Sequence, residues 1–115
     1  MRANVYFTRE TTPEKVVELY RALGVELPGK VAVKVHSGEK GNQNFLRPEF
    51  WRPMVEEVHG TIVECNTAYG DAAGGVRDHT ESHRKLLEEH GWTRYFDVDL
   101  MDAEGPDAVW PIPNG

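Results

Sequence analysis

Residues able to bind an anion and to move protons gather near the middle of the chain. The apolar stretch 31–35 (Val-Ala-Val-Lys-Val) runs into the loop 36–42 (His-Ser-Gly-Glu-Lys-Gly-Asn). Lys34 could hold an anion, while His36 and Glu39 could exchange a proton or bind a metal ion. We therefore interpret these three side chains as candidate catalytic residues. The alternative is a structural role, in which the His36 and Glu39 side chains only form hydrogen bonds with backbone groups of the loop.

Lys34 lies inside a stretch that reads as a strand. Alternation places Ala32, Lys34 and His36 on one face of that strand. A central strand of a parallel sheet is usually apolar on both faces, and an unpaired buried ammonium is very costly. Lys34 therefore needs a carboxylate partner or an anionic ligand. The alternative is an edge strand from which the amine extends into water.

The same loop and the helix after it offer further ligand-binding candidates. Gly38 and Asn42 tolerate positive φ and allow backbone N–H groups to approach an anion. The spacing matches neither a Walker loop nor a dinucleotide fingerprint. Arg47 precedes the helix that Pro48 begins, where it could bind a carboxylate or phosphate. A capping or surface role for Arg47 is equally open.

A second polar turn, containing Asn66, Thr67 and Tyr69, follows the apolar stretch 61–65. Turn chemistry alone could explain it, since Asn and Gly are common turn formers. Because both turns follow strands, we expect them to meet at one edge of the sheet. Asn66, Thr67 and Tyr69 are therefore candidate ligand-binding residues.

Histidines also raise the question of a metal site. His79 and His83 are four residues apart, so they share one face of a helix, as in zinc metalloproteases. Glu81 is misplaced for that motif, and a polar helix start is the simpler interpretation. The candidate metal ligands are His36 and His83, for a divalent ion.

Composition narrows the classes of function. The chain has 115 residues, a net charge of −6 and a single cysteine. Its scattered basic residues do not predict binding to nucleic acid or to an anionic membrane. One cysteine excludes an internal disulfide and an iron–sulfur cluster held by this chain alone. We see no secretory signal or membrane-spanning stretch, and we expect a cytoplasmic protein.

The elements that position these residues alternate between strand and helix. The pattern predicts an α/β fold of three layers, Rossmann-like, whose mostly parallel sheet of about four strands carries helices on its faces. Residues 1–103 form the predicted domain, and residues 104–115 a Pro/Gly-rich extension. The predicted strands are 4–8, 31–35, 61–65 and 92–98, and the predicted helices begin at Pro13, Pro48 and Thr80.

Two blocks of this sequence resemble the domain of unknown function 362 family, whose members often carry the label of iron–sulfur centre proteins. The first runs from Val31 to Glu39 and continues through Gly41-Asn42 and Leu46-Arg-Pro48; the second begins at Asn66-Thr67. The resemblance covers most of residues 2–97 and implies an α/β domain without an assigned reaction. Its motif residues include Lys34, His36, Glu39, Asn42, Arg47, Asn66, Thr67, Tyr69, Arg77 and His83.

The resemblance implies several functions. Many members add a cysteine-rich segment with 4Fe–4S clusters, so a cluster-bearing partner domain is expected here. Members are usually longer, which leaves a fragment, a split form and a minimal version as alternatives. We expect an anion- or metal-binding crevice at the carboxyl ends of the strands, in a redox protein family. A stand-alone small-molecule enzyme and a non-catalytic docking module are the other hypotheses, and an open sheet edge could allow a homo-oligomer.

Overall fold

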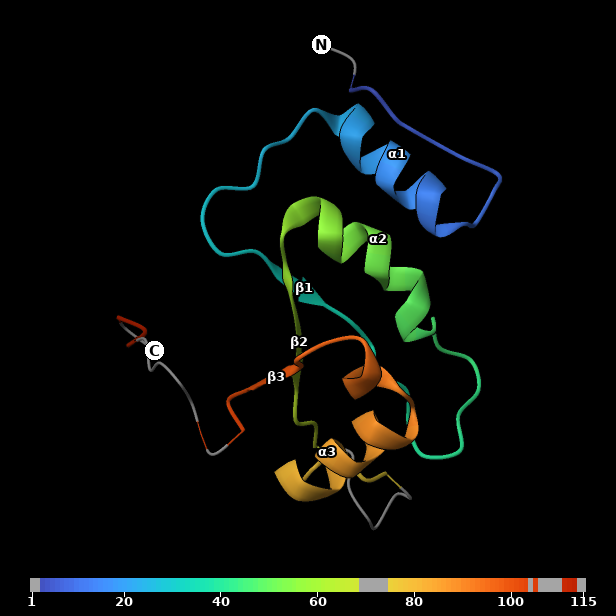
Figure 1. The fold of residues 1–115 in the computed structure, drawn as a ribbon. Helices are drawn as coiled ribbons and strands as arrows, with labels where there is room; N and C mark the ends of the chain where they lie inside the picture. The colour runs from blue at the N-terminus through green and yellow to red at the C-terminus, as the bar shows by residue number, and fades with distance from the viewer. Residues whose placement is uncertain (1–2, 69–74, 104, 106–110, 114–115) are drawn as a thin grey trace.

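The computed structural model describes residues 3–68, 75–103, 105 and 111–113. Its three described strands form one parallel sheet in the order β1-β2-β3, which confirms the predicted α/β class with three strands in place of about four. Along the chain the elements are α1 (Pro13–Leu23), β1 (Ala32–Lys34), α2 (Pro48–Val58), β2 (Thr61–Cys65), α3 (Thr80–Glu89), the 3-10 helix η2 (Trp92–Arg94) and β3 (Asp99–Met101) (Figure 1).

The sheet is short, and β2 is its central strand. Val33 of β1 pairs with Ile62 of β2, and Glu64 of β2 pairs with Leu100 of β3. Burial of apolar surface drives the packing around this ladder. The hydrophobic core that packs against the sheet consists of Val35, Val55, Ile62, Leu87, Trp92, Val98 and Leu100. Helices α2 and α3 therefore share one core with the sheet.

Helix α1 packs on α2 rather than on the sheet (Figure 1). Its predicted start at Pro13 is confirmed: the hydroxyl of Thr12 accepts a hydrogen bond from the Lys15 N–H at 3.3 Å. Gly24 ends the helix with φ of 63°. The Arg21 guanidinium binds both carboxylate oxygens of Glu57 on α2, at 2.7 and 2.6 Å. A bidentate ion pair thus joins the two helices.

The strand predicted over residues 4–8 is wrong. Residues 3–8 are irregular and pair with no strand in the described part of the chain. The side chains of Val5 and Phe7 are 89% and 78% exposed. Strand propensity reflects a fit to a packed, half-buried surface, and this segment has no such surface beneath it.

The strand predicted over residues 92–98 is also wrong. Gly91, with φ of 81°, leads into η2, and the strand begins only at Asp99. Trp92 is fully buried, and its indole N–H donates to the Ser37 carbonyl at 3.1 Å. A buried Trp needs such a partner, and satisfying it fixes a turn where aromatic content predicted an extended chain.

The polar turns after β1 and β2 lie at the same edge of the sheet, because the two strands run parallel (Figure 1). The Val35 N–H continues the ladder to the Val63 carbonyl at 3.3 Å. Past the end of β2, the Thr67 N–H donates to the Arg77 carbonyl at 2.8 Å. This bond brings the segment before α3 back to the strand ends.

Candidate functional site

The buried carboxylate of Glu64 is the centre of the polar structure at this edge. Glu64 lies in β2 and is 1% exposed. One oxygen accepts from the Lys34 ammonium and, at 3.1 Å, from the Cys65 N–H. The other accepts from the Ser37 N–H and hydroxyl, both at 3.1 Å, and from the Arg77 guanidinium at 3.0 Å. Five donors therefore saturate this carboxylate.

These contacts keep Glu64 ionised. Burial alone would raise the pKa of Glu64, because it penalises the charged form. The hydrogen bonds from Lys34 and from the Ser37 and Cys65 N–H groups, with the charge of Lys34, outweigh burial and leave the pKa below its usual value. Lys34 thus has a carboxylate partner, as one interpretation of the strand predicted, while β1 lies at the edge of the described sheet, as the alternative predicted. Its side chain remains 51% exposed, as the edge position of β1 allows.

Arg77 joins two carboxylates. Its guanidinium is almost fully buried and binds Glu39 of the first loop as well as Glu64 of β2. With Lys34, the group holds two cations and two anions, so its charges balance. We call Lys34, Glu39, Glu64 and Arg77 the charge network. Both cations of this network, Lys34 and Arg77, are therefore already paired with carboxylates of the protein.

A second set of buried polar groups extends from the charge network toward α3. The Nε2 atom of His83 lies 3.3 Å from the Ser37 hydroxyl, and its Nδ1 atom lies 3.1 Å from the Asn66 Oδ1 atom. The Asn66 amide NH₂ donates to the Thr80 hydroxyl at 3.0 Å. Because Oδ1 faces the ring, His83 carries its hydrogen on Nδ1, and the single hydrogen of the Ser37 hydroxyl is shared between the His83 Nε2 atom and the Glu64 carboxylate.

His83 is held as the neutral ring. Burial is the main cause that lowers the pKa of His83, followed by opposing effects of the charges of Glu64 and Arg77. Both ring nitrogens have protein partners, at Ser37 and Asn66. This histidine therefore ties the first loop, the second turn and α3 together.

A hollow of about 270 Å³ lies beside the first loop, where that loop approaches the start of α2. Its walls combine two asparagines and a histidine with aromatic and aliphatic side chains. The lining residues are His36, Asn42, Asn44, Phe45, Leu46 and Trp51. We call this space the loop hollow.

The loop hollow carries polar atoms that have no protein partner. The Gly38 N–H donates to the Nδ1 atom of His36 at 3.0 Å, so the neutral ring carries its hydrogen on Nε2. The Asn42 oxygen accepts from the Asn44 N–H at 2.7 Å, which leaves the Asn42 NH₂ group. Within the described residues, neither His36 Nε2 nor Asn42 Nδ2 nor the Trp51 indole N–H bonds to protein.

Arg47 adds positive charge next to the loop hollow. Its guanidinium stacks 4.3 Å from the centre of the Phe45 ring and donates to the Gln43 side chain at 2.8 Å. The His90 ring stacks on the other face of the Phe45 ring, with the two ring centres 4.5 Å apart. We call the Phe45 ring with these two neighbours the Phe45 wall. His90 in turn donates from Nδ1 to the Ser37 carbonyl at 2.9 Å. This wall is therefore anchored to the same loop as the charge network.

The structure divides the predicted site residues into two groups. Lys34, Glu39 and Arg77 belong to the charge network, and Asn66 and His83 adjoin it. The members that line or border the loop hollow are His36, Asn42 and Arg47. The remaining three are Gly38, which underlies the Phe45 wall, Thr67, which holds Arg77 through its backbone, and Tyr69, which lies outside the described residues.

The predicted metal ligands are placed differently from each other. His36 is exposed at the loop hollow, whereas His83 is buried with both ring nitrogens bonded. Among the residues that the structure describes, no group of three or more His, Cys, Asp or Glu side chains could hold a metal ion. The metal assignment stays a prediction.

Sequence reasoning missed Glu64, Ser37 and the aromatic wall of the loop hollow. Glu64 had a usable signal, because a carboxylate in the apolar stretch 61–65 raises the same question as Lys34 in its own strand. Ser37, Phe45 and Trp51 had no such signal. Their roles depend on contacts between segments far apart in the sequence.

Comparison with known proteins gives one match. The family model described as "Domain of unknown function (DUF362)" matches residues 31–114, which is most of the chain. The chain belongs to the DUF362 family. The match begins at β1 and includes both polar turns. No curated protein matches this DUF362 chain. No solved structure matches it either.

The helices of this DUF362 domain were compared with what a membrane span requires. In residues 3–68 and 75–103, none is long and apolar enough to cross a membrane. The expected cytoplasmic location stays a prediction.

Proposed function

We propose that this DUF362 domain binds a small anion, a carboxylate or a phosphate, in the loop hollow. The observation that carries the proposal is the set of unpaired N–H donors there, from His36, Asn42 and Trp51. His36 is exposed and Asn42 and Trp51 are half-buried, so their N–H donors are open to a ligand with acceptor oxygens. Arg47, at its rim, supplies the charge that a carboxylate or phosphate would meet.

In this proposal the charge network positions the first loop and leaves ligand contact to the loop hollow. Lys34 and Arg77 are neutralised by Glu64 and Glu39, so they are poor candidates for holding an external anion. Ser37, bonded to Glu64 through both its N–H and its hydroxyl, directly follows His36. The network thus sets the direction from which His36 enters the loop hollow.

A panel of ligands and variants tests the proposal. We expect orthophosphate, pyrophosphate or dicarboxylates such as malonate to raise the Tm of the protein, measured by thermal shift. The rise should disappear in His36→Ala and Asn42→Ala. His79→Ala is the matched control, because that histidine is exposed and outside the loop hollow. An equal rise in all four proteins would contradict the proposal.

The same panel addresses the metal and enzyme hypotheses. A rise with divalent metal ions alone, lost in His36→Ala, would favour metal binding over anion binding. A catalytic role for Lys34, His36 and Glu39 stays a prediction, and Lys34 and Glu39 each have a protein partner already. For either side chain to act on a substrate, its ion pair would have to open during turnover.

A docking role beside a cluster-bearing partner is the second proposal. The observation that favours it is the exposure of Val5 and Phe7, apolar side chains that nothing covers in the described residues. The single cysteine, Cys65, places any cluster in the partner. Titration of a purified ferredoxin-like 4Fe–4S protein tests it: Val5→Ser with Phe7→Ser should abolish any binding, and unchanged binding would exclude this surface.

A further inference from the structure

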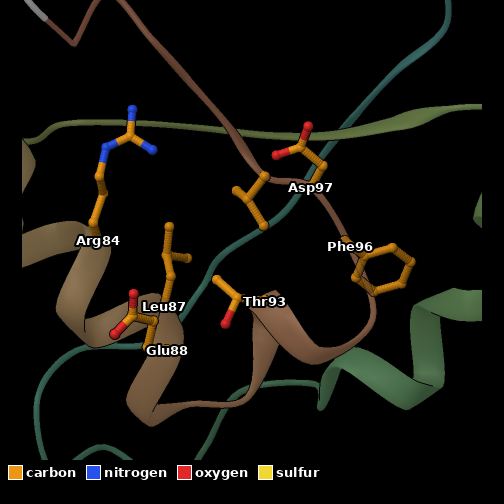
Figure 2. A pocket seen from close by; sticks show the side chains of 7 residues that line it. Arg84, Leu87, Glu88, Thr93, Phe96 and Asp97 are labelled. Carbon is orange, nitrogen blue, oxygen red and sulfur yellow. The ribbon is translucent and has the colours of Figure 1, made fainter.

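A second hollow, of about 360 Å³, lies between α3 and the segment that joins η2 to β3 (Figure 2). It is separate from the loop hollow and shares no lining residue with it. Its lining comes from α3 (Arg84, Leu87, Glu88) and from residues after it (Thr93, Phe96, Asp97, Val98). We call it the α3 hollow.

The α3 hollow combines charges of both signs with an apolar floor. Figure 2 shows the Arg84 guanidinium and the Asp97 carboxylate both in the upper part of the view, with Leu87 below them. Leu87 is buried, and Phe96 is half-buried at one side. Both charged groups thus lie on the same side of Leu87 in this view.

Three exposed charged side chains line the α3 hollow. Within the described residues, Arg84, Glu88 and Asp97 form no ion pair and no side-chain hydrogen bond. Arg84 and Glu88 are one helical turn apart on α3, a spacing at which such pairs often form, yet they do not pair here. Free charges of opposite sign at the rim of one hollow can bind a ligand that carries both signs.

We propose that the α3 hollow binds a free amino acid with an aliphatic side chain. The ligand carboxylate would pair with Arg84, the ammonium group with Asp97, and the side chain would rest on Leu87 and Phe96. The volume is near the lower end of the range of about 300–1,000 Å³ for ligand pockets, which fits a ligand of this size.

The test compares L-leucine with two analogues that each lack one charged group. 3-Methylbutylamine lacks the carboxylate, and 4-methylpentanoate lacks the ammonium group. Binding is followed by the amide ¹H–¹⁵N shifts of the full chain. We expect leucine to bind at least about tenfold more tightly than either analogue, because each charged hydrogen bond contributes to affinity. Absence of saturable leucine binding, or equal affinity for all three, overturns the proposal.

Two variants assign the contacts. Arg84→Gln should weaken leucine binding about tenfold or more and leave the amine unaffected; Asp97→Asn should weaken both leucine and the amine. Arg94→Gln is the control, because this Arg lies in η2 outside the α3 hollow. His36→Ala should leave leucine binding unchanged, which separates this inference from the proposed anion site. Equal effects of Arg84→Gln and Arg94→Gln would also overturn it.

Discussion

At the scale of single residues, Glu64 is the group on which the most other groups depend. It binds Lys34 and Arg77 and also fixes Ser37 through two hydrogen bonds. Ionic groups buried in this way cost desolvation energy that only complete pairing offsets. The loss of one member therefore leaves the others buried without a partner.

We expect Glu64→Gln to lower the free energy of unfolding by about 3–5 kcal/mol, the usual cost of breaking a buried ion pair. Urea denaturation measures the change. Glu57→Gln is the control, since it removes an exposed ion pair with Arg21 and should have little effect. Equal effects of the two substitutions would show that the charge network adds no stability.

His83 makes a prediction about pH. Burial lowers the pKa of His83 below its ordinary 6.5, so the unfolded chain takes up a proton before the folded chain does. The stability from this residue is present above about pH 6.5 and is lost as the pH falls toward the lowered value. The pKa of Glu64 is also lowered, and its contribution is lost at more acidic pH, below about 4.5.

The check is urea denaturation at pH 7.5 and pH 5.5. Wild type should lose stability between these values, and His83→Gln should lose less, although it is less stable overall. His79→Gln, at an exposed histidine, should keep the wild-type dependence. If His83→Gln kept that dependence too, neutral burial of His83 would not be its cause.

Residue types alone predicted part of the site. Lys34 in an apolar strand predicted either a carboxylate partner or an anionic ligand, and Glu64 is its carboxylate partner. The alternative of an edge strand also holds for β1 within the described sheet. His36 and Asn42 do line one hollow. That Lys34 and Glu39 would belong to a separate, self-neutralised group could not be predicted, because it depends on where Arg77 returns to the strand ends.

At the scale of elements, the loop after β1 is shaped by close packing at Gly38. This glycine has φ of 90°, and a Cβ there would lie 2.6 Å from the Phe45 ring and 3.0 Å from the His90 ring. Only a residue without a side chain lets the loop pass beneath the Phe45 wall. The shape of the loop hollow therefore depends on this position.

Gly38→Ala and Gly41→Ala form a matched pair. Both glycines have positive φ, but a Cβ at Gly41 meets open space. Gly41→Ala should cost about 1–2 kcal/mol of stability for the backbone conformation alone. Gly38→Ala should cost at least about 1 kcal/mol more from overpacking, and it should also weaken anion binding. If thermal or urea unfolding showed the same loss of stability for both variants, the Phe45 and His90 rings would move aside easily to make room for the added Cβ.

Local signals predicted the helices better than the strands. The start of α1 was predicted at Pro13, and Thr12 caps it there, because capping residues act within a few positions of the helix end. The strands expected at residues 4–8 and 92–98 failed for a different reason. A strand needs a neighbour to pair with, and the burial of Trp92 was set by a contact with Ser37, far away in the sequence.

At the scale of the whole molecule, the helices are unequally attached. α1 lies on the outer side of α2, while β2 lies in the core between β1 and β3 (Figure 1). We infer that α1 is the less stable part of the fold.

Hydrogen exchange tests this inference. Amides of β2, from Thr61 to Cys65, should exchange slowest, and amides of α1 should exchange faster by local opening. Arg21→Gln, which removes the ion pair to Glu57, should speed exchange in α1 and leave β2 unchanged. Equal protection of α1 and β2 would indicate a single cooperative unit.

The most direct test of the proposed anion site uses the indole N–H groups of two tryptophans. Trp51 lines the loop hollow, and Trp92 is buried with its N–H on Ser37. In a ¹H–¹⁵N titration with pyrophosphate or malonate, assigned by Trp51→Phe, the Trp51 indole signal should shift saturably while the Trp92 signal stays in place. A stationary Trp51 signal, or equal shifts of both signals, would contradict anion binding in the loop hollow.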